Sequence, residues 1–153
     1  MSDSEFWLIT QTKLPVSPES AFSFFSDASN LKRITPPWLR MEILSSLPVE
    51  MKQGAEILYR IRMYSIPLKW KTRITLWDPP SRFVDVQEKG PYREWVHEHL
   101  FESVENGAVM TDRVRYRHFG GKLINRLFVA ARLKEIFDYR ARRIKEIFSE
   151  THG

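Results

Sequence analysis

The sequence predicts an α+β fold in which a curved, seven-stranded antiparallel sheet surrounds a long C-terminal helix. Two short helices are expected between the first and second strands. Three observations lead to this prediction: strand-like segments are separated by turn residues, the C-terminal segment has helical periodicity, and no segment has low complexity. We therefore expect residues 1–153 to form a single domain.

Proline and capping residues delimit the N-terminal elements. A strand rich in Phe, Trp, Ile and Thr is expected over residues 5–14 and ends before Pro15. Ser17 can cap a short helix that begins at Pro18, because its hydroxyl satisfies a free amide of the first turn. A second short helix is expected over residues 28–34, before two consecutive prolines.

Hairpins connect the remaining strands, which makes the sheet antiparallel. The Asn106-Gly107 pair is the strongest hairpin signal, since both residues tolerate positive φ. If this pair forms a two-residue turn, Glu98 faces Arg115 outside and His97 faces Tyr116 inside. The strands are expected at residues 40–47, 55–64, 68–77, 82–88, 92–104 and 108–118.

The C-terminal segment from Lys122 to Glu150 is expected to form one long helix. Its apolar residues recur at steps of three and four, so they form a stripe that the sheet must cover. The stripe comprises Leu123, Leu127, Ala130, Leu133, Phe137, Ala141, Ile144 and Phe148.

Alternation along the strands assigns their two faces, because successive side chains point to opposite sides. Basic residues occupy the outer face, and aromatic and aliphatic residues occupy the inner face. On the strand at 68–77 the expected inward residues are Trp70, Thr72, Ile74 and Leu76. The same parity directs several polar side chains inward among Trp, Phe and Ile, a composition typical of a small-ligand cavity. The candidate ligand-binding residues are Tyr59, Trp70, Asp85, Gln87, Trp95, His97, His99, Asp112 and Tyr116.

The His97-x-His99 pair leaves three interpretations open. The imidazoles can belong to a structural network with Asp85, Asp112 and Tyr116, or they can face an organic ligand. In the third interpretation they bind a metal together with one carboxylate, although their spacing alone is a weak metal signal. No resident cofactor or metal is expected, and the catalytic residues are unknown.

Charge and cysteine content restrict the classes of function. The chain has no cysteine, which excludes disulfides and thiolate chemistry and is compatible with the cytoplasmic location that we expect. Its net charge of +5 is concentrated in the C-terminal segment. We interpret the basic strands as a solvated outer face and expect no nucleic-acid partner. The basic end of the helix is a candidate contact for an anionic membrane surface or a protein partner, through Arg140, Arg142, Arg143 and Lys145.

Several short motifs resemble the START-like, or SRPBCC, superfamily, and in particular its bacterial branch of polyketide cyclase-like ligand-binding proteins. The resemblance extends from Phe6 to Phe148 and implies a helix-grip fold with an internal cavity between sheet and long helix. The motifs are Asn30-Leu31, Thr35-Pro36-Pro37, Gly54, Phe83-Val84-Asp85-Val86-Gln87, Gly90-Pro91-Tyr92, Trp95-Val96-His97-Glu98-His99, Phe101, Asp112-Arg113-Val114, Tyr116 and Phe137-Asp138-Tyr139-Arg140.

Three functions remain open at this level. We favour binding or transport of a small hydrophobic ligand, either a lipid or an aromatic, polyketide-like molecule. The first alternative is a cyclase or dehydratase in which His97 or His99 acts as general acid or base. The second is an interaction protein that acts in cell division or at a membrane.

Overall fold

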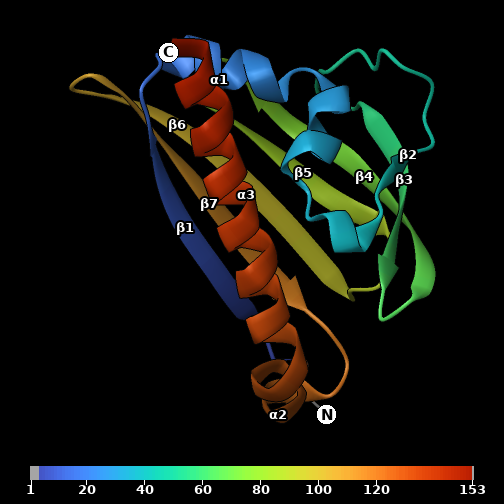
Figure 1. Cartoon of the computed structure of the whole chain (residues 1–153). Coiled ribbons are helices and arrows are strands. Elements are labelled where there is room, and N and C mark those ends of the chain that lie inside the picture. Colours follow the sequence, from blue (N-terminus) through green and yellow to red (C-terminus); the bar gives the residue numbers. More distant parts are fainter. Residues whose placement is uncertain (1–3, 153) are drawn as a thin grey trace.

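Seven strands form one antiparallel sheet, and the helices lie along its concave face and across one end (Figure 1). The computed structural model describes residues 4–152, with side chains described through Ser149. The elements in chain order are β1 (Phe6–Leu14), α1 (Pro18–Phe25), the 3-10 helices η1 (Ala28–Ile34) and η2 (Pro37–Leu39), β2 (Glu42–Ile43), β3 (Glu56–Met63), β4 (Ile66–Asp78), β5 (Arg82–Lys89), β6 (Glu94–Val104), β7 (Gly107–Arg117), α2 (Gly121–Ile124), the π-helical turn η3 (Asn125–Val129) and α3 (Ala130–His152).

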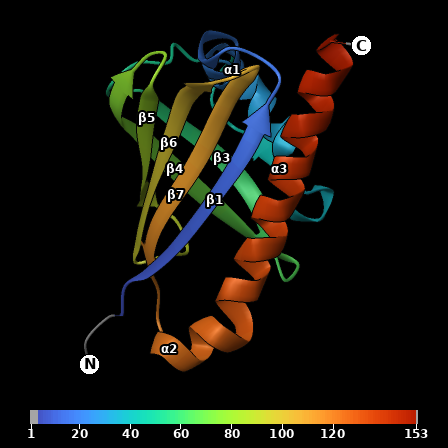
Figure 2. The same cartoon turned by 90° about the vertical axis from the view of Figure 1, so that its left-hand side faces the viewer.

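The strand order is β1-β7-β6-β5-β4-β3-β2, so the first strand pairs with the last. The sheet twists and curls, and α3 lies in the resulting trough (Figure 2). The predicted fold class is confirmed, including the two short helices expected between β1 and β2, which are α1 and η1; the structure adds a third short helix, η2. Within residues 4–152, no helix is long and apolar enough to cross a bilayer.

The helix α3 packs through an apolar stripe against the sheet. Leu133, Phe137, Ile144 and Phe148 are buried, as their spacing predicts. Each fully buried Leu or Phe side chain contributes about 2 kcal/mol of transfer free energy. This stripe therefore holds the helix over the sheet.

The N-terminal part of the expected helix differs from the prediction. Leu123 and Leu127 are each more than half exposed, although the periodicity placed them against the sheet. The π-helical turn over Asn125–Val129 inserts one extra residue, which rotates the preceding residues by about 100° relative to α3. Asn125 therefore faces inward, where it accepts a hydrogen bond from the Tyr116 hydroxyl at 2.9 Å.

The β6–β7 hairpin has a register two residues away from the predicted one. Val104 pairs with Gly107, so Glu105 and Asn106 form the connection rather than Asn106 and Gly107. His97 consequently lies opposite Val114 and not opposite Tyr116. A shift of two residues preserves the inward and outward faces, because the side-chain period of a strand is two.

A bulge changes the end of β4. Its register with β5 shifts between Ile74 and Leu76. As a result Trp77 contacts the core ring of Phe22, at a centroid distance of 4.9 Å, in the place where Leu76 was expected. One extra residue in a strand reverses the parity of every residue beyond it.

Candidate functional site

Two histidines and two aspartates meet on the concave face of three neighbouring strands. His97 and His99 lie on β6, between Asp85 on β5 and Asp112 on β7. The hydrogen bonds cross the sheet diagonally: His97 Nε2 lies 2.7 Å from Asp112 Oδ1, and His99 Nε2 lies 2.6 Å from Asp85 Oδ2. The imidazole rings stack with a centroid distance of 3.7 Å. Each histidine is therefore tied to a different carboxylate.

Arg140 enters this cluster from α3. Its Nε lies 3.3 Å from Asp112 Oδ2 and its Nη2 lies 3.2 Å from Asp112 Oδ1, so it holds the carboxylate with two donors. The same Nη2 lies 3.4 Å from His99 Nδ1. Arg140 is only 7% exposed, so it is not part of the outward basic surface predicted for the helix end.

The position of Arg140 on the helix could have revealed this role. It follows Phe137 by three residues and precedes Ile144 by four, and both of these neighbours are buried. Residues at these steps share one helix face. A cation on the apolar face of a helix indicates a buried anionic partner, which here is Asp112.

The other basic residues of the predicted surface lie outside the cluster. Arg142 and Arg143 both form ion pairs with Glu146, at 3.9 and 2.6 Å. Lys145 is exposed. Arg140 is therefore not available for the membrane or partner contact predicted at the basic end of the helix. Of the three other cations predicted there, two form ion pairs with the same carboxylate, that of Glu146.

Charge and burial set the protonation of the cluster. Burial opposes ionisation of Asp112, but the Arg140 guanidinium and the hydrogen bond from His97 outweigh it and hold the pKa of this carboxyl well below its usual range. Burial likewise opposes ionisation of Asp85, and the hydrogen bond from His99 overcomes it, so its pKa is lowered too. Both carboxylates are therefore ionised at neutral pH.

His99 is neutral at neutral pH. Burial, followed by the neighbouring His97, lowers the pKa of its imidazole to about 4. Since a guanidinium only donates hydrogen bonds, Nδ1 of His99 accepts from Arg140 and the ring proton is on Nε2, which donates to Asp85. Both ring nitrogens of His99 are thus engaged.

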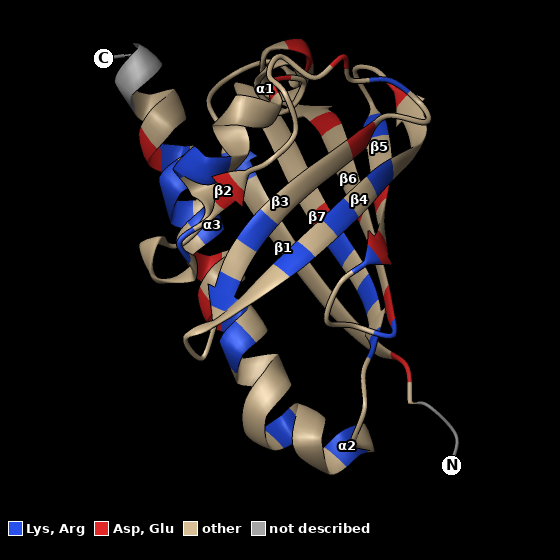
Figure 3. Ribbon diagram, turned by 90° about the vertical axis from the view of Figure 1, so that its right-hand side faces the viewer, with Lys and Arg blue, Asp and Glu red and all other residues tan. Residues whose placement is uncertain are grey.

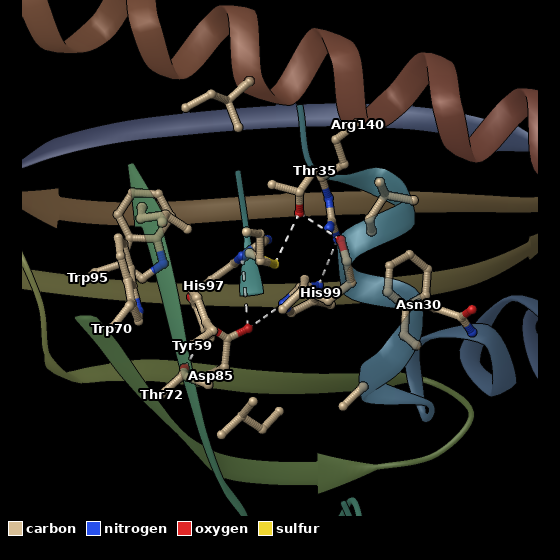
Figure 4. Close-up of a pocket in the computed structure, with 18 of the residues that line it drawn as sticks. Asn30, Thr35, Tyr59, Trp70, Thr72, Asp85, Trp95, His97, His99 and Arg140 are labelled. Atoms are coloured by element: carbon tan, nitrogen blue, oxygen red, sulfur yellow. Dashed lines mark hydrogen bonds and ion pairs between the residues drawn. The ribbon is translucent and has the colours of Figure 1, made fainter. Parts of the chain in front are cut away.

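A cavity of about 180 Å³ lies between the sheet and α3, and this cluster forms one part of its wall (Figure 4). Aromatic side chains from β3, β4, β6 and the β5–β6 turn form a second part, and apolar side chains of η1 and α3 form a third. The aromatic part comprises Tyr59, Trp70, Tyr92 and Trp95. The helical part includes Leu31, Ile34, Leu133, Ile136 and Phe137.

Asp85 and Tyr59 are polar groups of the cavity wall that keep unused hydrogen-bonding capacity. The Asp85 side chain keeps 18% of its surface exposed, whereas that of Asp112 keeps 3%. Burial and the negative charge of Asp85 raise the pKa of Tyr59 well above its ordinary value, so its hydroxyl stays protonated. Within residues 4–149 no hydrogen bond engages this hydroxyl, which leaves it able to donate to a ligand.

Six of the nine candidate residues line the cavity: Tyr59, Trp70, Asp85, Trp95, His97 and His99. The other three lie behind or beside it. Asp112 supports His97 and Arg140 from the far side. Gln87 binds the backbone of Tyr92 through both atoms of its amide, at 2.7 and 3.1 Å, and so braces the turn before β6. Tyr116 binds Asn125.

The metal interpretation can be tested against this geometry. One ligand atom each from Asp85, His97 and His99 lies within 4.8 Å of the others. However, the Nε2 proton of His99 already fills the contact with Asp85, and Arg140 lies beside the opposite nitrogen. A divalent cation would require that proton to leave Nε2 and would face a guanidinium close by. The arrangement therefore fits a hydrogen-bonded network better than a metal centre.

A curved antiparallel sheet closed by a long C-terminal helix over an internal cavity defines the helix-grip class of proteins. The chain belongs to the family described as polyketide cyclase / dehydrase and lipid transport proteins, whose model matches residues 14–140. This confirms the predicted membership of the START-like superfamily, and family and fold together support a protein that binds hydrophobic ligands. No curated protein sequence matches the chain.

Solved structures share the fold. Protein Ms6760 from Mycobacterium smegmatis is 13% identical with a TM-score of 0.72, and the alignment covers 99% of each chain. A norcoclaurine synthase point mutant from Thalictrum flavum is 14% identical with a TM-score of 0.72, over 100% of this chain and 99% of that one. A nucleoside-diphosphate sugar epimerase from Corynebacterium glutamicum is 24% identical with a TM-score of 0.67, over 91% of this chain and 28% of that one.

Proposed function

We propose that the protein binds a small hydrophobic ligand, lipid-like or aromatic, inside the cavity between the sheet and α3. The observation that carries this proposal is the segregation of the wall. Apolar and aromatic side chains form most of it, while the ionised groups gather on one side and are paired with each other. Ligand cavities in proteins have this composition, with a few polar groups that orient the ligand.

The polar end of the ligand is expected to lie against Asp85 and Tyr59, which both line the cavity (Figure 4) and interact electrostatically. Asp85 Oδ1 receives one hydrogen bond, from the Thr72 hydroxyl at 3.3 Å, and a carboxylate oxygen can accept more. The Tyr59 hydroxyl can donate or accept. A hydroxyl group on an otherwise apolar ligand would satisfy both. In this proposal residues 1–153 act as one ligand-binding domain.

Native mass spectrometry of protein purified from its own host tests the proposal, followed by denaturing extraction and identification of any bound molecule. A cavity-filling variant, Ile136→Trp, removes the space for a ligand because Ile136 lines the cavity. Lys134→Trp is the matched control, since Lys134 is exposed on the same helix. We expect a bound molecule in the wild type and in Lys134→Trp, and loss of that molecule in Ile136→Trp.

Equal recovery of the molecule from the wild type and from Ile136→Trp would contradict the proposal. The comparison requires that both proteins are folded, which a cooperative unfolding transition shows. A second result would contradict the proposal as well: neither the wild type nor Lys134→Trp takes up a fluorescent fatty acid or a naphthalene probe. Either result would mean that the cavity does not bind a ligand as proposed.

An enzyme of cyclase or dehydratase type is the second candidate. Imidazoles held by carboxylates at a cavity wall favour it, since carboxylates fix the tautomer of a catalytic histidine. Binding without chemistry is nevertheless preferred, because both nitrogens of His99 are engaged and its pKa is about 4, far from neutral pH.

Incubation separates the two candidates. The molecule recovered from the cavity is returned to fresh protein, and its mass and NMR spectrum are followed over time, because ring closure without loss of water leaves the mass unchanged. An unchanged mass and an unchanged spectrum support a binding protein. Loss of water or ring closure that disappears when His97 and His99 are both replaced by Asn would establish the enzyme, and turnover that survives this double replacement would exclude the imidazoles as its acid or base.

A further inference from the structure

The N-terminal end of the long helix carries a cluster of exposed apolar side chains. We call residues 119–129 the foot. Phe119, Leu123, Leu127 and Phe128 of the foot are each more than half exposed. The π-helical turn contributes to the exposure of Leu123 and Leu127, because it rotates them away from the sheet. In both views the foot projects beyond the end of the sheet (Figures 1 and 2).

The foot carries cations and no carboxylate. From Arg113 to Lys134 the sequence contains no Asp or Glu and seven Lys or Arg, of which the five outside the foot form ion pairs with Asp or Glu side chains of the sheet or of α3. Lys122 and Arg126 lie within the foot, are exposed, and have no ion-pair partner within the described residues 4–149. Figure 3 shows basic residues and no acidic ones on α2 and the turn that follows. The foot therefore joins exposed apolar groups to exposed cations.

A second exposed apolar tip lies at the same end of the molecule. The β3–β4 turn presents Tyr64 and Ile66, both exposed, and the Arg132 guanidinium of α3 lies 5.1 Å from the ring centre of Tyr64. Met63 and Leu133, the sequence neighbours of Tyr64 and Arg132, line the cavity. The apolar tip, the helix and the cavity thus meet at this end.

Exposed apolar residues elsewhere have different surroundings. Trp7 and Ile9 lie on the outer face of β1, where Trp7 donates a hydrogen bond to Glu5 and lies 5.6 Å from Arg113. The outer sheet is covered by ion pairs of both signs, such as Arg117 with Glu94 and Arg73 with Glu88. These pairs neutralise the basic strands, whereas the cations of the foot keep their charge available.

We propose that the foot, together with the β3–β4 turn, docks the protein on a bilayer surface that contains anionic lipids. Apolar side chains flanked by Lys and Arg bind in the headgroup layer, where the apolar groups enter the acyl boundary and the cations meet lipid phosphates and carboxylates. A surface with apolar groups and only positive charge matches this layer. The docking does not depend on the ligand proposal, so either can fail while the other stands.

Vesicle flotation tests the docking with the full chain. The probes are large unilamellar vesicles of phosphatidylcholine alone and of phosphatidylcholine mixed with phosphatidylserine. We expect the wild type to bind the mixed vesicles, to bind the neutral vesicles weakly, and to lose affinity as salt rises. Each cation beside an anionic surface strengthens binding about fivefold.

Two pairs of variants locate the binding surface. The double variant Lys122→Glu with Arg126→Glu should weaken binding at least about 25-fold, which is two cations at fivefold each. Its matched control is Arg142→Glu with Lys145→Glu, which reverses the same number of exposed charges at the other end of the helix. Leu127→Ser with Phe128→Ser should weaken binding on the order of tenfold. Its control is Trp7→Ser with Ile9→Ser on β1. All eight side chains are on the surface, so the unfolding midpoints should stay close to that of the wild type.

Three results would overturn the proposal. Absence of flotation with the mixed vesicles excludes a lipid surface. Binding that survives both foot variants but is lost in the control at the other helix end would place the contact there. A concentration-dependent dimer in analytical ultracentrifugation, disrupted by Leu127→Ser with Phe128→Ser and combined with no flotation, would assign the foot to a second copy of the chain.

Discussion

The front and the back of the buried polar cluster differ, although each consists of a histidine hydrogen-bonded to an aspartate. At the back, Asp112 is held by His97 and by two donors of Arg140, and almost none of its side chain is exposed. At the front, Asp85 binds His99 and Thr72 and still reaches the cavity. The back is saturated with partners and stabilises the fold, whereas the front keeps capacity for a ligand.

Removing Arg140 should have the largest effect. Arg140→Met leaves the buried carboxylate of Asp112 without its guanidinium, and breaking a buried pair in this way costs about 3–5 kcal/mol of unfolding free energy. Urea unfolding at neutral pH measures the loss. Arg142→Met is the control, since Arg142 is exposed two residues further along the same helix, and it should change stability by no more than about 0.5 kcal/mol.

A companion variant sharpens the first prediction. Arg140→Met combined with Asp112→Leu removes both charges and should recover part of the lost stability, because an apolar pair has no buried charge to compensate. Equal stabilities for Arg140→Met and Arg142→Met would mean that Arg140 is not part of the buried network in solution.

The next effect concerns pH and His99. Its pKa is lowered from 6.5 to about 4, so between these values the unfolded chain binds a proton that the folded protein does not. The associated stability is fully present above pH 6.5 and is lost as pH falls towards 4, by about 3 kcal/mol at most. The two aspartates have lowered pKa values and contribute to pH dependence only below their ordinary value of 3.8.

His99→Gln isolates this contribution. The amide keeps a donor near Asp85 but does not titrate, so the fall in stability between pH 6.5 and 4 should be smaller by the amount that His99 supplies. Urea unfolding at several pH values provides the comparison. Parallel curves for the two proteins would show that His99 is not held in its neutral form by the fold.

The smallest effect on stability is expected at the front of the cluster. Asp85→Asn keeps an acceptor for His99 and should cost about 1 kcal/mol, while ligand affinity should fall about tenfold. Asp112→Asn is the matched change at the back, and it should destabilise by several times more because Arg140 loses its anion. Equal destabilisation by the two variants, measured in the same urea titrations, would remove the distinction between front and back.

Strand parity predicted much of the candidate site. His97 and His99 face inward together because they lie two residues apart on one strand, and the two-residue error in hairpin register left this unchanged. The same reasoning failed at Leu76, where a bulge reversed the parity and packed the partly buried Trp77 against the core. Bulges depend on the fit between neighbouring strands, which alternation along one strand does not report.

Arg140 is a residue whose burial could not be predicted from the number of charged residues near the helix end. Within the sequence it is one of several cations near a helix end, where charge favours solvent. Its burial depends on Asp112, which reaches it only after β7 and α3 pack together. Helical spacing places Arg140 on the same face as Phe137 and Ile144, which indicates burial. Only the structure identifies Asp112 as the anion that pairs with it.

Local patterns in the sequence suffice to predict the order of the elements, the antiparallel sheet, the inward faces of most strands and the apolar stripe of α3. Each of these follows from local periodicity, turn residues or the alternation of side chains. The crossed His–Asp pairs, the burial of Arg140, the outward rotation of the foot and the different exposure of Asp85 and Asp112 depend on how distant segments pack together. These features arise between segments distant along the chain, where packing and pairing of charges select one arrangement among several that the local pattern allows.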